Sequence, residues 1–267
     1  MNALLRYIFH KKMFAPYFYG VHKRILSNTD LFRSRKRIIH EGFTMDLDLS
    51  DWIPQNIYYL GYYERRELNF LRNTLKPGDV FIDVGANVGL FTLMASKLVG
   101  ANGRVYAFEP FSKSYDNLQL NISLNKFSNI IAEKLAVTDQ EKDMILGFDE
   151  MDQNSGMVSE FAEFGAGHEN VHAITLDDYF SEFNGSLKMI KIDIEGGELN
   201  ALRGMRSILL KHKPILLIEL EEILLMKAGA GIKAVGEFMD ETGYKSVPFE
   251  NDGTGSKNAV FVPIGFQ

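Results

Sequence analysis

Between Asp79 and Leu220 the chain alternates short apolar runs with amphipathic segments of about 10–15 residues. This alternation is typical of βαβ units, in which a mostly parallel sheet carries helices on both faces. The apolar runs predict strands at Asp79–Val84, Arg104–Glu109, Asn129–Thr138, Leu187–Ile194 and Pro214–Leu220. The amphipathic segments predict helices at Val88–Val99, Ser112–Lys126, Glu198–Lys211 and Lys233–Thr242. We therefore predict an α/β fold with a doubly wound sheet.

The segments around this core are less regular. They predict a strand at Phe43–Leu49, a helix at Glu64–Leu75, and a terminal hairpin of Tyr244–Pro248 with Asn258–Pro263 around Asn251-Asp252-Gly253. Between Asp139 and His172 we expect loops with one strand at Met144–Phe148, followed by a short helix at Thr175–Phe180. We divide the chain into a basic N-terminal extension, residues 1–40, and a main domain, residues 41–267, with a softer boundary near residue 75.

The composition excludes several classes of site. The sequence has no cysteine, so it can form neither a disulfide framework nor a thiolate zinc site, and it offers no cysteine nucleophile. No apolar run approaches the ~18 residues of a membrane-spanning helix, and the N-terminus lacks the pattern of a secretory signal. We expect a cytoplasmic protein.

Charge is distributed unevenly along the chain. Residues 1–40 hold nine Lys or Arg and one acid, Asp30, whereas the remainder is strongly acidic and brings the net charge to −6. Apolar residues are interleaved with the basic ones, which suits peripheral binding to the inner, anionic membrane surface. The alternative is a helical extension that packs on the main domain or on a second subunit.

The first core strand ends in a glycine loop, Asp83-Val84-Gly85-Ala86-Asn87-Val88-Gly89, that leads directly into a helix. Gly85 and Gly89 permit a tight turn and close approach of a ligand to the backbone. A dinucleotide-binding loop would read G-x-G-x-x-G, whereas the spacing here is G-x-x-x-G after an acid. The Asp83 carboxylate would repel a pyrophosphate and attract the ammonium of a methionine moiety. The loop therefore favours S-adenosylmethionine.

The next two strand ends suit a nucleoside. Glu109 lies 20 residues after Gly89, where a carboxylate can accept both hydroxyls of a ribose. Ala136, within Leu135-Ala136-Val137, follows the third strand and is apolar enough to flank an adenine; an ordinary core position is the alternative.

The fourth strand combines an apolar face with three ionisable residues. Period-2 alternation predicts Lys191, Asp193 and Glu195 on one face and isoleucines on the other. Charges on a central strand are costly unless they are paired, bound to a ligand or exposed. We favour a functional site over a structural Lys191–Asp193 network, because the carboxyl ends of parallel strands are where ligands bind. Glu219 and Glu221 repeat the pattern after the fifth strand.

Five blocks in this order resemble the FkbM family of S-adenosylmethionine-dependent methyltransferases. They are Gly61-Tyr62-Tyr63-Glu64, Asp83–Gly89, Phe108-Glu109-Pro110, Leu176-Asp177-Asp178 and Ile190-Lys191-Ile192-Asp193-Ile194-Glu195-Gly196. The glycine loop is shared by many methyltransferases, whereas the last block, with Leu-Asp-Asp ahead of it, is more specific. Gly197 departs from the family, which more often has Ala there, and residues 1–40 lie outside the resemblance.

The resemblance implies a class I methyltransferase fold, with a seven-stranded Rossmann-like sheet whose last strand is antiparallel. It implies methyl transfer to a hydroxyl, with sugars, glycans and glycolipids among the acceptors. Carried over by position, the cofactor-binding residues are Glu64, Asp83, Gly85, Asn87, Gly89, Glu109 and Asp193, with Ala136 from the strand pattern. Asp193, Glu195 and Lys191 would act at methyl transfer.

Several choices stay open at this point. The proton of the acceptor hydroxyl could leave to a carboxylate, to His168 or His172, or after activation by Mg²⁺ held by Asp193, Glu195 and Glu219. Both histidines are better explained as surface residues. A non-catalytic cofactor-binding scaffold and a nicotinamide-dependent oxidoreductase are the alternative functions. We expect a small-molecule or glycan acceptor and no nucleic acid; a homo-oligomer is an open choice.

Overall fold

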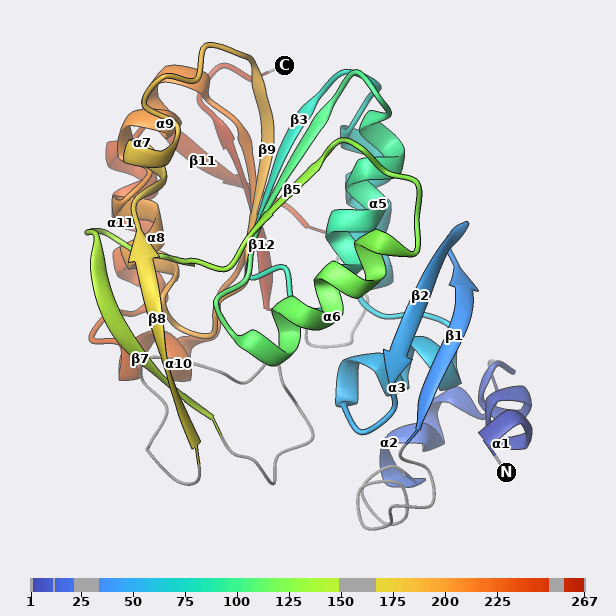
Figure 1. Ribbon diagram of the computed structural model, residues 1–267. Coiled ribbons are helices and arrows are strands. Elements are labelled where there is room, and N and C mark those ends of the chain that lie inside the picture. The colour runs from blue at the N-terminus through green and yellow to red at the C-terminus, as the bar shows by residue number, and fades with distance from the viewer. Residues whose placement is uncertain (1, 12, 22–33, 149–166, 250–256, 267) are drawn as a thin grey trace.

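The computed structural model describes residues 2–11, 13–21, 34–148, 167–249 and 257–266 (Figure 1). Its main sheet has seven strands in the order β11-β12-β10-β9-β3-β4-β5. The bounds are β3 Val80–Val84, β4 Arg104–Phe108, β5 Ile130–Glu133, β9 Leu187–Ile192, β10 Ile215–Glu219, β11 Tyr244–Val247 and β12 Asn258–Pro263. Only β12 runs against its two neighbours, while the other pairings of this sheet are parallel. The predicted fold class is confirmed.

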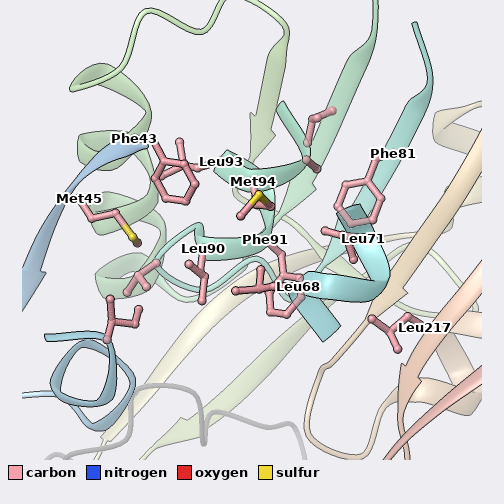
Figure 2. Packing of buried hydrophobic residues seen from close by; sticks show 14 of the residues in the cluster. Phe43, Met45, Leu68, Leu71, Phe81, Leu90, Phe91, Leu93, Met94 and Leu217 are labelled. Carbon is pink, nitrogen blue, oxygen red and sulfur yellow. The ribbon is translucent and has the colours of Figure 1, made fainter. Parts of the chain in front are cut away.

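Helices cover both faces of this sheet, as the alternation of side chains requires. On one face, Phe81, Met189 and Leu217 pack against α4 (Arg65–Thr74) and α5 (Leu90–Val99), as Figure 2 shows for part of this core. On the other face lie Ile82, Ile190 and Leu216. The helices on that side are α7 (Leu176–Tyr179), α8 (Glu198–Arg203), α9 (Arg206–His212) and α11 (Ile232–Glu241), and α6 (Ser112–Ser123) follows β4.

Three predicted elements are wrong in extent. The strand Asn129–Thr138 is two strands, because after β5 the chain leaves the main sheet and β6 (Ala136–Val137) pairs with β8 (Gly167–Ile174). The helix Glu198–Lys211 is broken into α8 and α9 at Gly204, where a Cβ would lie 1.9 Å from the Thr138 carbonyl oxygen. The irregular middle contains two paired strands, β7 (Lys142–Phe148) and β8, instead of one.

Several elements within the first 75 residues were not predicted from sequence periodicity. They are α1 (Asn2–Phe9), the 3₁₀ helix Ala15–Tyr17, α2 (Phe18–Val21), β1 (Arg35–His40) and α3 (Trp52–Leu60); α10 (Glu222–Lys227) was missed later in the chain. β1 pairs with β2 (Phe43–Asp48) in a hairpin, so the boundary drawn at residue 40 falls in its turn. The predicted turn at Asn251-Asp252-Gly253 lies outside the described residues, although the strands β11 and β12 do pair. Across the described part of the chain, no helix is both long and apolar enough to cross a bilayer.

Candidate active site

A cavity of about 660 Å³ opens at the carboxyl ends of β3, β4, β9 and β10. Most of the residues predicted for the site line it, namely Glu64, Gly85, Asn87, Glu109, Lys191, Asp193 and Glu195. Three further wall residues, Ile53, Tyr63 and Phe91, were not predicted, because the pattern gave no reason to bring α3 or the face of α5 to this edge. Glu219, noted only as a weaker candidate, also lines the cavity, as do Ala86, Val88 and Leu90 of the glycine loop and the start of α5.

The glycine loop is shaped by close contact with the end of β9. A Cβ at Gly85 would lie 1.9 Å from the carbonyl oxygen of Asp193, so only glycine fits there, with a φ of 85°. Gly89 has a φ of 91° and begins α5, where a Cβ would lie 2.6 Å from Leu118 Cδ1. Asn87 has a φ of 48°, a left-handed conformation that Asn tolerates better than most residues. Both glycines and Asn87 are therefore fixed by the geometry of the loop.

Glu109 is held in one orientation by the backbone. Its Oε2 accepts a hydrogen bond from Asn87 N at 2.8 Å, and its Oε1 accepts one from Phe111 N at 2.9 Å. Burial raises the pKa of Glu109 to about 7, against the opposing effect of these two bonds. Each carboxylate oxygen keeps a second lone pair, which can accept from a ligand hydroxyl.

Lys191 is the buried cation of the site. It lies opposite Asp83 in the parallel register of β3 and β9, and its Nζ is 2.7 Å from Asp193 Oδ2 and 4.6 Å from the centre of the Phe91 ring. Burial alone would lower the pKa of Lys191, but the carboxylates of Asp193, Glu64 and Asp83 outweigh burial and raise it. Lys191 therefore stays charged at neutral pH.

Asp193 is the carboxylate of the cavity that ionises most readily. Burial opposes its charge, but the Lys191 ammonium and a hydrogen bond from Glu219 lower its pKa. Burial and the nearby Asp193 charge raise the pKa of Glu219 to about 10, so Glu219 is protonated at neutral pH and donates to Asp193.

The remaining two carboxyls of the wall also favour their protonated forms. Burial raises the pKa of Glu64 to about 8 despite the nearby Lys191, and burial together with the Asp193 charge raises that of Glu195 to about 8. Both residues have positive φ, 44° and 56°, which is unusual for glutamate and is most often retained where a site requires it. The cavity thus holds two groups that change protonation just above neutral pH.

The predicted alternation along the fourth strand is correct only up to Ile192, where β9 ends. Asp193 continues on the Lys191 side, but Glu195 reaches the cavity through the left-handed turn Glu195–Gly196 and not by strand periodicity. Glu198 shapes this turn, since its Oε1 accepts from the backbone N–H groups of Ile194 and Gly196.

Asp83 does not line the cavity. It is fully buried beneath the glycine loop, where its Oδ2 accepts from Thr92 Oγ1 at 2.6 Å, while Oδ1 has no hydrogen-bond partner among the residues that the structure describes. Asp83 therefore lies behind Lys191 and contributes its charge to the wall from there.

Ala136 lines a second, mainly apolar cavity of about 510 Å³. This cavity shares Gly85 with the first one and includes Pro110, the residue after Glu109. Phe108, Val137, Met144 and Leu146 supply further apolar wall. Glu109 thus stands between a carboxylate-rich cavity and an apolar one.

Other motif residues have structural tasks. Asp177 of Leu176-Asp177-Asp178 accepts hydrogen bonds from the backbone N–H groups of Ser207 and Ile208 and so caps α9.

His168 and His172 are exposed on β8 outside both cavities, and His172 pairs with Asp143, which agrees with their interpretation as surface residues. Within the described ranges, no three acidic or histidine side chains are arranged to hold a metal ion. The structure therefore does not support the alternative in which Mg²⁺ activates the acceptor hydroxyl.

The comparison with protein families agrees with this geometry. A family model described as "Methyltransferase FkbM domain" matches residues 83–246, from the glycine loop to β11. The chain belongs to this family. The match includes Glu109 and the Lys191–Glu195 block, but not Glu64.

Individual relatives are more distant. "Methyltransferase 1" of the fungus Beauveria bassiana is 27% identical over 149 residues, which are 48% of this chain and 59% of that protein. The chain therefore spans about three fifths of that relative's length. A solved structure of methyltransferase FkbM from Methylobacillus flagellatus is similar with 15% identity and a TM-score of 0.48, covering 94% of this chain and 59% of that one.

An rRNA methylase of Streptococcus thermophilus is also similar in structure, at 11% identity and a TM-score of 0.42, covering 73% of this chain and 91% of that one. The comparisons thus include a protein named for a nucleic-acid acceptor. They do not support our expectation that nucleic acid is excluded.

Proposed function

We propose that the protein is an S-adenosylmethionine-dependent O-methyltransferase whose acceptor is a hydroxyl of a sugar, glycan or glycolipid. The observation that carries the proposal is the position of Glu109 between the two cavities, with both carboxylate oxygens fixed by backbone N–H groups. The apolar cavity around Ala136 would take the adenine, Glu109 the ribose hydroxyls, and the acidic cavity the methionine end.

Charge supports this orientation of the cofactor. Its methionine end carries an ammonium and a sulfonium, and four carboxyl groups of the acidic cavity face that end around the single cation Lys191. Burial and neighbouring carboxylates raise the pKa of Glu64 and of Glu195, although Lys191 lies near the first and Lys257 near the second. A further cation in the cavity would favour the ionised forms of both groups. The cofactor brings the activated methyl group, so the chain has to position the acceptor and take up its proton.

We assign different tasks to the carboxyl groups at the methyl end. A general base works best when its pKa lies near the working pH, and Glu195, with a pKa of about 8, satisfies that condition. Asp193 is ionised more readily and is held by Lys191, so it would orient the acceptor hydroxyl as a hydrogen-bond acceptor. The acidic wall disfavours anionic groups next to the reacting atom, which suits an uncharged hydroxyl.

A labelled methyl donor tests this function. The protein is incubated with S-adenosylmethionine carrying a deuterated methyl group and with separate glycan, glycolipid and RNA extracts, and the products are examined by mass spectrometry. A deuterated methyl ether in a saccharide is expected, and Glu195→Gln serves as the low-activity control. Label on RNA or on nitrogen would refute the acceptor class. Cofactor binding without transfer to any extract would indicate the scaffold, and stabilisation by a nicotinamide cofactor alone would indicate the oxidoreductase.

A further inference from the structure

A group of exposed apolar and aromatic side chains lies on the first 21 residues. Leu4, Tyr7, Met13, Tyr17 and Tyr19 are between 62% and 70% exposed, and we call them the N-terminal patch. Single exposed apolar residues are ordinary, but five within 16 residues of sequence are an unusual concentration.

Packing on α3 accounts in part for Tyr19, whose ring centre lies 6.0 Å from that of Trp52 in an edge contact, but a different set of side chains does most of this packing. Phe9 and Phe18 are buried against each other, with ring centres 5.2 Å apart, and Phe18 stacks on Trp52 of α3. On α1, Asn2 accepts a hydrogen bond from the Tyr59 hydroxyl of α3. Leu4 and Tyr7 lie one turn apart on the other side of α1. The extension therefore has one apolar side that is covered by α3 and a second that is not.

The charge of the same segment identifies the surface that would cover it. Residues 1–29 contain five Lys or Arg and no Asp or Glu. Lys11 lies at the patch itself, with its Nζ 4.6 Å from the centre of the Tyr7 ring. Exposed tyrosines beside basic side chains match the interface of an anionic bilayer, where the rings lie at the headgroup level and the cations meet lipid phosphates.

The patch is also connected to the cavity. It lies on elements that pack against α3, and Ile53 of α3 lines the wall of the acidic cavity. Figure 1 shows α1 and α2 grouped around α3, next to the main domain. A bilayer bound through the N-terminal patch would thus be connected to the wall of the acidic cavity through one helix, α3.

We propose that the N-terminal patch docks the protein on an anionic lipid bilayer and holds the acidic cavity close to acceptors in that bilayer. Tyr7, Tyr17 and Leu4 enter the interfacial layer, and Lys11 beside Tyr7 binds the headgroups. Docking itself does not depend on methyl transfer, whereas the claim that docking holds the cavity close to its acceptors rests on the proposed function.

Flotation of the full chain with lipid vesicles tests the docking. Vesicles of phosphatidylcholine with phosphatidylglycerol are compared with phosphatidylcholine alone, at low and at physiological salt. The triple variant Leu4→Ser, Tyr7→Ser, Tyr17→Ser is compared with a control, Ile39→Ser with Leu210→Ser, which removes exposed apolar side chains from β1 and α9. Thermal unfolding and cofactor titration are measured for each variant.

Binding to the anionic vesicles is expected for the wild type and for the control, with a loss of at least about tenfold in the triple variant. Unfolding temperature and cofactor affinity should stay the same, which separates a failure of docking from a failure of the proposed function. Absence of binding to anionic vesicles at low salt would overturn the proposal. Equal losses in the triple variant and the control would overturn it too, as would a change of oligomeric state without a change in vesicle binding.

Discussion

Replacement of Glu195 by Gln should lower turnover and raise stability at the same time. The Glu195 carboxyl lies in the left-handed turn after β9, and burial with the Asp193 charge raises its pKa from 4.5 to about 8. Glutamine keeps the size and the hydrogen-bonding oxygen of the side chain but can neither ionise nor accept a proton. Loss of a general base reduces turnover by about 10²- to 10⁴-fold.

The gain in stability follows from proton linkage. A carboxyl whose pKa is raised in the fold binds its proton more tightly in the folded state, so the stability of the wild type falls as pH rises from about 4.5 through about 8. One pKa unit corresponds to about 1.4 kcal/mol, and solvent access to Glu195 reduces the full effect, so we expect a gain of about 1–3 kcal/mol for Glu195→Gln at pH 8. At pH 4.5 the gain should vanish.

Turnover is measured with the labelled donor, and the free energy of unfolding by urea denaturation at pH 4.5 and 8. Glu237→Gln is the control, because Glu237 pairs with Lys233 on the exposed surface of α11, outside the cavity wall. Unchanged turnover in Glu195→Gln would refute the base assignment. A variant less stable than the wild type at pH 8 would show that Glu195 supports the fold as an ion.

Three further outcomes are expected. Asp193→Asn should lower turnover but destabilise the fold by less than about 3 kcal/mol in urea denaturation, because Lys191 still has the carboxylates of Glu64 and Asp83 near it. Breaking a buried ion pair costs at least about that much, so a larger loss would show that Asp193 has a structural role. Binding of S-adenosylmethionine at pH 7 should release protons from Glu64 and Glu195. The release is measured by calorimetry as a binding enthalpy that depends on the ionisation enthalpy of the buffer, and net proton uptake would contradict the proposed orientation of the cofactor. Gly85→Ala should lose at least about 2 kcal/mol of unfolding free energy, since its Cβ would clash with the Asp193 carbonyl oxygen, and wild-type stability would show that the loop shifts freely.

The sequence predicted the central sheet because each of its inner strands is an apolar run buried on both faces. It did not predict that the chain leaves this sheet after Glu133, since the segment between β5 and β6 contains no glycine or proline and interrupts the apolar run only with Glu133-Lys134. The period-2 pattern also could not show where β9 stops, and so misassigned the route of Glu195. The backbone register determines where the chain leaves the sheet, and the positive φ of Glu195 determines its route to the cavity. Neither feature produces a periodic pattern in the sequence.

The candidate site, too, could be predicted from the sequence only in part. Residues at strand ends, such as Glu109 and Lys191, could be predicted because parallel strands end at one edge. Tyr63 and Ile53 could not, because they come from α3 and the turn after it, in a segment whose helix the periodicity missed. The hydrogen bond between Glu219 and Asp193 depends on the parallel pairing of β9 with β10, which places the two strand ends side by side.

Calorimetric titration of S-adenosylhomocysteine into the wild type and Glu109→Ala tests the central claim, that Glu109 holds the ribose between the two cavities. Loss of charge-assisted hydrogen bonds worth about 1.5–3 kcal/mol should weaken the dissociation constant by about 10- to 100-fold. The unfolding temperature without ligand should fall as well, because Asn87 N and Phe111 N lose their acceptor, so the titration is done well below that temperature. Wild-type affinity in Glu109→Ala, or no binding to the wild type, would contradict the account.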